Sequence, residues 1–255
     1  LEGPDCPLLA APEELAELAG LMEAPMRLED QDGDHLTLIQ QEPLMAVAGI
    51  AARKKDGETV SGDAGTYFKR GDGTLYVLLC DGMGSGPQAN RESSLALRLL
   101  EQFLQAGVET EHALVTLNSA LALRGEEAGG FTTVDLLQVD LFTGDGVVFK
   151  LGAAPTYVRK GGTVRRISGA SLPAGLAAEE RSAPDRFPIH LSPGDCVLLV
   201  SDGVTGTEDD SWLRERLVKF DQGSPKELAR DLITHSPQGA TDDSTALVIR
   251  LEKRE

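Results

Sequence analysis

Residues 75–87 read LYVLLCDGMGSGP, and this stretch decides how the rest of the chain is interpreted. Its first six residues are all apolar, as in a strand that is buried on both faces. Asp81 ends the run, and a glycine-rich loop leads into Pro87, which suits the first position of a helix. A carboxylate at the end of a buried strand is unfavourable unless a cation or hydrogen-bond donors compensate for its lost hydration. The stretch therefore predicts a buried strand, a close-approach loop and a candidate metal ligand at Asp81.

Two further aspartates occupy similar positions. Asp202 follows an apolar run that ends at Val200, and Asp242 precedes the last predicted strand, residues 245–251. An Asp-Gly pair taken alone is a hairpin signal. After Asp81 and Asp202, however, the chain continues toward a helix and does not return directly into a strand. Three aspartates at corresponding strand ends predict shared divalent ions, and ligands that are all oxygens favour Mg²⁺ or Mn²⁺ over zinc.

Other interpretations of the loops are less well supported. A dinucleotide-binding Gly-x-Gly-x-x-Gly motif requires glycine where Pro87 stands. A serine-hydrolase turn at Ser85 requires glycine two positions earlier, where the chain has Met83. Residues 30–34 resemble the start of a calcium loop, but the sixth position is His35 instead of glycine. A polar turn is the preferred interpretation there.

The charge of the chain argues against nucleic acid as a partner. The sequence has 24 Lys and Arg against 41 Asp and Glu, a formal net charge of −17. This excess repels a phosphate backbone unless basic residues cluster strongly. The two basic groups, at residues 53–55 and at Arg165 and Arg166, are interpreted as solvated strand or loop ends.

Composition also bears on location. The three cysteines form no close pair, which fits a reducing cytoplasm, and the scattered histidines argue against zinc. No run approaches the ~20 apolar residues that cross a bilayer, so no membrane contact is expected for this chain. The expected location is the cytoplasm, and because the chain does not begin with methionine it is interpreted as a piece of a longer protein.

Hydrophobic periodicity predicts blocks of strands and pairs of helices. Helical patterns lie at residues 12–23, 111–124, 212–220 and 225–235, and a long one opens at Pro87 and includes Phe103. Strands lie at 131–141, 146–151, 155–159 and 195–200. Residues 55–58 are a turn signal between two possible strands. Blocks of this kind favour an α+β fold in which helices lie on the outer faces of antiparallel sheets.

The motifs resemble those of the metal-dependent protein phosphatases of type 2C, and in particular the stage II sporulation protein E branch. The matching segments, in order, are residues 60–63, 81–86, 201–203 and 242–245, and the resemblance extends from about residue 36 to 251. It implies a four-layer α-β-β-α sandwich of two antiparallel sheets flanked by helices. Residues 36–255 are then the catalytic domain, and residues 1–35 are an N-terminal linker or regulatory segment.

The resemblance also implies a site that holds two Mn²⁺ or Mg²⁺ ions. By position, Asp81 bridges the two ions, the carbonyl of Gly82 binds one of them, and Asp202 and Asp242 hold the other. Asp63 is implied to be a further ligand or a nearby acceptor. The residues that carry catalysis on this interpretation are Asp81, Asp202 and Asp242.

Two departures from the family pattern affect the chemistry. Met83 stands where eukaryotic relatives commonly carry a histidine proposed as a general acid, so the leaving group is expected to take its proton from water. No counterpart is identified for the basic residue that holds phosphate in those relatives, so phosphate binding is expected to rest on the metals alone. Thr132 and Thr133 are interpreted as structural. The helices at 87–124 are a hypothetical movable regulatory element because they directly follow the Asp81 loop.

The predicted function is a protein-serine/threonine phosphatase in which a metal-activated water hydrolyses phosphoserine. The substrate that the branch implies is a phosphorylated anti-sigma factor antagonist. The alternative is a non-catalytic phosphoprotein-binding or scaffolding module of the same fold. Because such modules usually lose a ligand and all three aspartates are present, the enzyme is favoured. A third interpretation, a structural β sandwich with ordinary Asp-Gly turns, predicts no metal dependence.

Overall fold

The computed structural model describes residues 12–32, 35–123, 130–176, 183–206, 209–220 and 223–254. The chain forms two compact units, Leu1–Pro43 with Arg254–Glu255, and Leu44–Lys253. The first contains helix α1 (Pro12–Leu21) and an antiparallel hairpin of β1 (Met26–Asp32) and β2 (His35–Gln40). The helix predicted at residues 12–23 is confirmed. The polar turn predicted at residues 30–34 lies partly outside the described residues.

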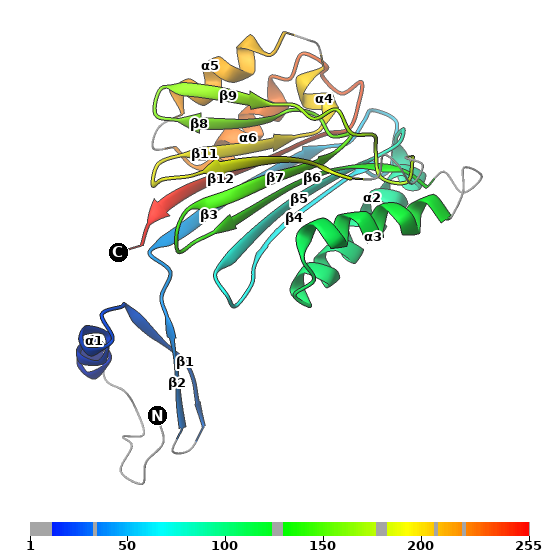
Figure 1. The fold of residues 1–255 in the computed structure, drawn as a ribbon. Coiled ribbons are helices and arrows are strands. Elements are labelled where there is room, and N and C mark those ends of the chain that lie inside the picture. The colour runs from blue at the N-terminus through cyan, green and yellow to red at the C-terminus, as the bar shows by residue number, and fades with distance from the viewer. Residues whose placement is uncertain are drawn as a thin grey trace. The chain divides into compact units, whose positions relative to one another are not determined.

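The second unit is built on two five-stranded sheets (Figure 1). One has the order β10-β7-β6-β5-β4 and the other β3-β12-β11-β8-β9, and every neighbouring pair is antiparallel. The strands are β3 (Leu44–Arg53), β4 (Asp63–Lys69), β5 (Thr74–Gly82), β6 (Thr132–Asp140), β7 (Asp145–Leu151), β8 (Thr156–Lys160), β9 (Thr163–Ile167), β10 (Asp185–His190), β11 (Cys196–Val200) and β12 (Ser244–Lys253). The predicted antiparallel α+β class is confirmed.

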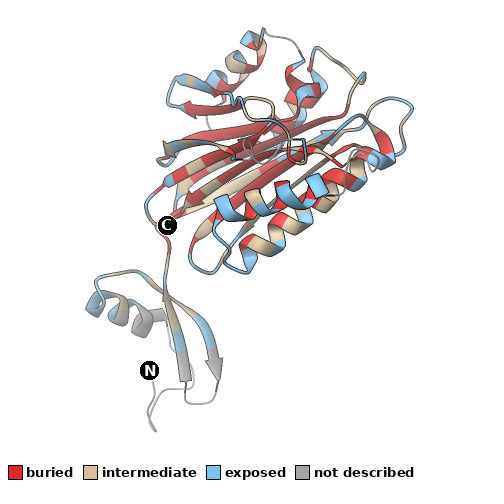
Figure 2. Ribbon diagram, turned by 45° about the vertical axis from the view of Figure 1, so that its right-hand side comes forward, coloured by how far each residue is buried: buried red, intermediate tan, exposed pale blue. Residues whose placement is uncertain are grey.

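Helices cover the outer face of each sheet. Helices α2 (Gly86–Gln105) and α3 (Thr110–Leu123) share an apolar cluster with the sheet that contains β5. Helices α4 (Asp202–Thr205), α5 (Ser211–Lys219) and α6 (Pro225–Thr234) share another with the sheet that contains β11. The exposed residues of these helices lie on their outer sides, whereas the strands are mostly buried (Figure 2). The predicted four-layer α-β-β-α arrangement is therefore confirmed.

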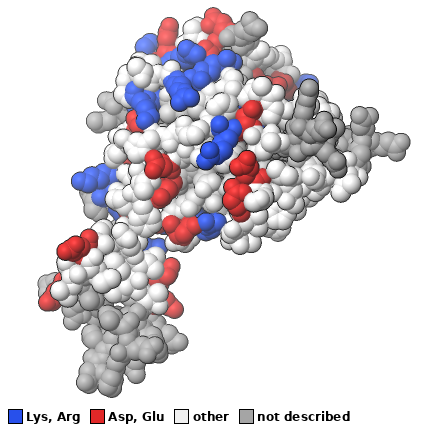
Figure 3. All heavy atoms as spheres, viewed as in Figure 1, with Lys and Arg blue, Asp and Glu red and all other residues white. Residues whose placement is uncertain are grey.

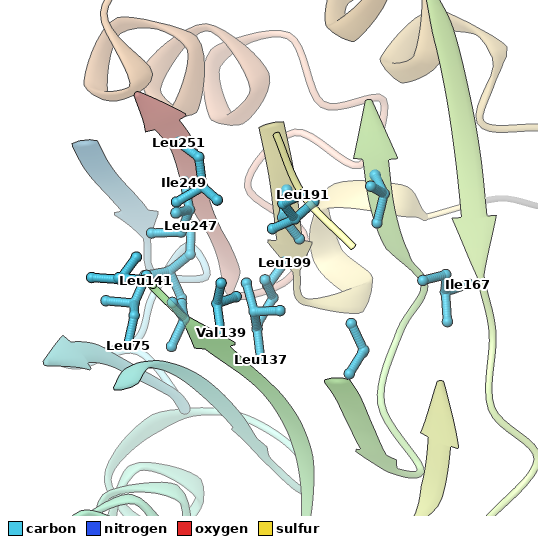
Figure 4. Close-up of a cluster of buried hydrophobic side chains, with 14 of the residues drawn as sticks. Leu75, Leu137, Val139, Leu141, Ile167, Leu191, Leu199, Leu247, Ile249 and Leu251 are labelled. Carbon is cyan, nitrogen blue, oxygen red and sulfur yellow. The ribbon is translucent and has the colours of Figure 1, made fainter. Parts of the chain in front are cut away.

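The main core lies between the two sheets. It forms because successive side chains along each strand point to opposite faces of the sheet. In β5, Leu75, Val77 and Leu79 belong to the inter-sheet cluster, while Tyr76 and Leu78 belong to the cluster under α2 and α3. Leu247, Ile249 and Leu251 of β12 meet the inward-facing series from the opposite sheet (Figure 4). Strand β5 is thus buried on both faces, as its uninterrupted apolar run predicts.

The turn predicted at residues 55–58 is confirmed. The N–H of Glu58 donates to the carbonyl of Lys55 at 3.2 Å, and the turn lies between β3 and β4, which belong to different sheets. Strands β9 and β10 were not predicted. Strand β10 contains Pro188 and is an edge strand, the position in a sheet that tolerates a residue without a backbone N–H.

Basic side chains gather in one region of the surface. On the face shown in Figure 3, Lys and Arg lie over β8 and β9, where Lys160, Arg165 and Arg166 are exposed. Nε of Arg166 lies 3.2 Å from Oδ2 of Asp210. The prediction that Arg165 and Arg166 belong to a solvated part of a strand is confirmed. Among the described residues, no helix has both the length and the apolar character that crossing a membrane requires.

Candidate metal centre

The alternation of β5 directs Asp81 between the two sheets. Asp81 continues the inward-facing series of Leu75, Val77 and Leu79. Asp63, the first residue of β4, is the register partner of Asp81 in the antiparallel pair. Opposite residues on one face of such a pair have Cβ atoms about 5 Å apart. The fold therefore brings together two carboxylates that are distant in the sequence.

The opposite sheet supplies the other two predicted ligands. Asp202 begins α4 two residues after the end of β11, and Asp242 lies two residues before the start of β12. Together with Asp81 and Gly82, these aspartates line one cavity of about 320 Å³. The structure thus places four of the five predicted metal-site residues around one space, while Asp63 is buried beside Asp81.

The glycines after two of the aspartates allow close backbone approach. A side chain at Gly82 would lie 2.2 Å from the carbonyl oxygen of Ala89 in α2. A side chain at Gly203 would lie 1.9 Å from the carbonyl oxygen of Asp243. No other residue type fits at either position without movement of the backbone. These Asp-Gly pairs are therefore strand-to-helix turns packed against other segments, and the hairpin interpretation is wrong for both.

The carboxylates at the site repel one another, and of these Asp63 is buried, Asp81 is half-buried and Asp202 is exposed. Burial, followed by the charges of Asp63 and Asp202, raises the pKa of Asp81 to about 9. Burial is the main cause that raises the pKa of Asp63 to about 6, and the side chains of Thr245 and Ser201 partly offset it. Burial and then the charge of Asp242 raise the pKa of Asp202. A site of this kind favours a compensating positive charge.

Asp63 also has unused ligand capacity. Neither of its buried carboxylate oxygens has a hydrogen-bond partner among the described residues. Also among these residues, no three carboxylate, imidazole or thiol groups form a complete metal-ligand set. Mg²⁺ usually keeps several water ligands and needs only one or two carboxylates. The oxygen donors that line the cavity, with the unpartnered oxygens of Asp63 beside them, therefore fit hydrated Mg²⁺ or Mn²⁺.

Two residues of the site were not identified from the motifs. The buried carboxylate of Asp243 accepts hydrogen bonds from the backbone N–H groups of Lys55 and Gly62, both at 2.8 Å. These bonds hold the segment that crosses between the sheets. Lys55 in that segment is the one basic side chain among the described residues that line the cavity. Asp243 lies in the matching segment 242–245 but was given no role there. Lys55 was interpreted only as part of a solvated basic group and of a turn, and its place at the cavity corrects that interpretation.

The backbone of Asp81 is held by two threonines of β6. Thr132 Oγ1 donates to the carbonyl oxygen of Asp81 at 2.7 Å, and the N–H of Asp81 donates to Thr133 Oγ1 at 3.3 Å. Both threonines also line the cavity. The structural role predicted for Thr132 and Thr133 agrees with these contacts.

Comparison with known families identifies the chain. The family model described as Stage II sporulation protein E (SpoIIE) matches residues 71–252. This chain belongs to the stage II sporulation protein E family. Curated SpoIIE proteins of Priestia megaterium and Bacillus subtilis (strain 168) are 30% and 29% identical over 213 and 214 residues, 80% of this chain in each case. The chain spans 36% and 25% of the lengths of these two relatives.

Solved structures of SpoIIE have the same fold. One is the PP2C phosphatase domain of Bacillus subtilis SpoIIE, solved with a fragment of its regulatory domain. It matches this chain with a TM-score of 0.79 and 25% sequence identity, and the match covers 96% of this chain and 76% of that one. The phosphatase domain in a crystal form without domain swapping matches with a TM-score of 0.62 and 26% identity, covering 85% and 96%. RsbX in complex with magnesium, at 18% identity and a TM-score of 0.66, shares the fold over 89% of this chain and 100% of its own. This member of the SpoIIE family therefore contains a PP2C-type serine/threonine phosphatase domain.

Proposed function

We propose that the domain hydrolyses phosphoserine in a protein with two Mn²⁺ or Mg²⁺ ions held at the cavity. Asp81, Asp202, Asp242 and the Gly82 carbonyl are the proposed ligands, and Asp63 supports them from beside Asp81. The observation that carries the proposal is the position of the half-buried Asp81 beside the charges of Asp63, Asp202 and Asp242 at the cavity. Such an arrangement is costly to the fold unless cations are bound there.

The residues of the chain have separate tasks in this reaction. When bound, the ions polarise the phosphate oxygens and lower the pKa of the attacking water. Asp81, Asp202 and Asp242 orient that water by fixing the ions, and Thr132 and Thr133 hold the backbone of Asp81. Water adds to phosphorus, the bond to the serine oxygen breaks, and that oxygen takes a proton from solvent. Met83 has no acidic proton to donate.

The proposed substrate is a phosphorylated anti-sigma factor antagonist. Membership of the SpoIIE family supports this choice, because the type 2C resemblance of this branch implies that class of phosphoprotein. Such a substrate places the domain in the cytoplasm.

Release of phosphate from a phosphoserine protein tests the proposal. The folded domain is expected to release phosphate with Mn²⁺, to stop with excess EDTA, and to resume when Mn²⁺ is restored. Failure to release phosphate from phosphorylated anti-sigma factor antagonist or p-nitrophenyl phosphate with either metal would favour a non-catalytic phosphoprotein-binding module. In that case, metal-dependent binding of the phosphoprotein without turnover is the expected result.

Lys55 is expected to bind the phosphate of the substrate. Lys55→Ala removes a charged contact to the phosphate. It should raise KM about tenfold, which corresponds to ~1.4 kcal/mol of binding free energy, with a smaller change in kcat. Steady-state kinetics with a phosphopeptide checks this, and Lys55→Arg should retain most of the affinity. Lys219→Ala, an exposed site on α5, is the control. An unchanged KM in Lys55→Ala would show that the metals alone bind the phosphate.

A further inference from the structure

One side of the cavity is apolar. Met83, Phe131 and Pro173 line it together with the acidic residues. The antiparallel register pairs Gly82 with Thr132, so Met83 and Phe131 follow at the next opposed positions of the two chains. An isolated bridge between Thr132 and Ala174 brings Pro173 to the same place. Three separate segments therefore converge to form an apolar wall beside the carboxylates.

Large apolar side chains are exposed on and next to this wall. Met83 of the wall is 59% exposed, and Leu172 and Leu176, which flank Pro173 in the sequence, are 40% and 45% exposed. We call Met83, Phe131, Leu172, Pro173 and Leu176 the apolar rim. Single exposed apolar residues are normal on a protein surface, but a group beside a polar cavity is typical of a binding site.

The segment that carries the two leucines is firmly held. The N–H of Ala174 donates to the carbonyl of Thr132 at 2.9 Å, and a reciprocal bond measures 3.1 Å. The N–H of Gly175 donates to Asn118 Oδ1 of α3 at 2.8 Å, and the Ser171 hydroxyl donates to the backbone of β7 at 2.8 Å. Because the backbone is fixed, the leucines present a preorganised surface whose side chains lose little freedom when a partner binds.

We propose that the apolar rim binds an apolar side chain that flanks the phosphoserine in the substrate protein. The inference rests on the proposed function of the cavity and adds a substrate preference to it. A phosphoserine whose phosphate reaches the carboxylates and Lys55 must place its neighbouring residues against the cavity wall. Since that wall offers Met83, Phe131 and Pro173, an apolar neighbour gains contact and loses exposed surface, whereas a polar neighbour loses hydration without a partner.

The test compares two phosphoserine peptides of equal length and charge. One carries leucine on both sides of the phosphoserine, and the other carries glutamine there. The wild-type protein with Mn²⁺ is expected to show a kcat/KM about tenfold higher for the leucine peptide, the effect of partly burying one or two leucines. In Met83→Ser and in Leu172→Ser, the ratio of the two kcat/KM values should fall toward one. Val218→Ser, which removes a similarly exposed apolar side chain from α5, should keep the wild-type ratio.

A second measurement separates this inference from the proposed function. Peptides in which a methylene replaces the bridging oxygen of phosphoserine cannot be hydrolysed, so their binding can be followed by fluorescence anisotropy without turnover. Tighter binding of the leucine version, lost in Leu172→Ser, supports the apolar rim even if no phosphate is ever released. Equal affinities and equal kcat/KM values for the two peptides would overturn it. A wild-type dimer that Leu172→Ser converts to a monomer, as measured by light scattering, would also overturn it by assigning the surface to a second copy of the chain.

Discussion

Asn in place of Asp81 is expected to remove the metal-dependent phosphatase activity and, at the same time, to make the metal-free protein more resistant to heat. Asp81 is half-buried and lies near the charges of Asp63 and Asp202, so its carboxylate is unfavourable unless a cation is bound. Asparagine has nearly the same shape but no charge. The variant should therefore be folded and should lack the carboxylate that is proposed to bridge the two ions.

The expected loss of kcat/KM in Asp81→Asn is at least about 1000-fold, or ~4 kcal/mol of transition-state stabilisation. The melting temperature without metal should rise by about 2–4 °C for each kcal/mol of repulsion removed, since the chain has more than 150 residues. Addition of Mn²⁺ should raise the melting temperature of the wild type and leave that of the variant nearly unchanged. Activity assays and thermal melts with and without Mn²⁺ give both results.

Asp72→Asn is the matched control. Asp72 is an aspartate in the turn between β4 and β5, at the other end of the strand pair that carries Asp63 and Asp81, and it bonds to Arg70. The Asp72→Asn variant should therefore keep the wild-type activity and the wild-type response to Mn²⁺. A variant at Asp81 that is inactive but less stable without metal would contradict the repulsion argument, and one that remains active would contradict the assignment of Asp81 as a ligand.

The sequence predicted the site best where a local pattern is enough. An uninterrupted apolar run followed by aspartate identified β5, and the order of the motifs led to the two-sheet fold. Period-two alternation also explains why Asp81 faces the opposite sheet, because it continues the series of Leu75, Val77 and Leu79. These conclusions depend on residues close together in the chain.

The remaining features depend on distant pairings. Lys55 reaches the cavity because Asp243 holds its backbone N–H across 188 positions of sequence. The turn near Gly57 was predicted, but only the order of strands in the sheets shows that it lies where the chain crosses from one sheet to the other. The apolar rim is formed by three segments that only the tertiary pairings bring together. In a single sequence, neither the spacing of residues nor the composition indicates which distant segments pair.

A buried ion pair near the same end of the sandwich provides a separate test of the fold. Lys150 of β7 and Asp135 of β6 are register partners, and both are almost fully buried. Lys150 Nζ lies 2.9 Å from Asp135 Oδ2 and donates to the carbonyl of Ala154 at 2.6 Å. Thr156, at the start of β8, donates to the same carboxylate oxygen at 2.5 Å. The pair thus links the two sheets.

Lys150→Met is expected to lower the free energy of unfolding by about 3–5 kcal/mol, because it leaves the carboxylate of Asp135 buried without its cation. Burial already raises the pKa of Asp135 even with Lys150 present. Chemical denaturation measures the loss. The pair of exposed Lys160 and buried Asp195, 3.8 Å apart, is the control, and Lys160→Met should cost less than about 1 kcal/mol because Asp195 keeps the N–H of Ser192 as a donor.

The double variant Lys150→Met with Asp135→Leu distinguishes the cost of an unpaired charge from the loss of a necessary link. If the unpaired carboxylate is the main cost, the double variant should recover most of the stability that the single variant loses, because well-packed apolar residues often replace a buried ion pair with little cost. If the double variant is as unstable as Lys150→Met, the link to Thr156 and Ala154 matters more than the charge. A single variant within 1 kcal/mol of the wild type would contradict the argument.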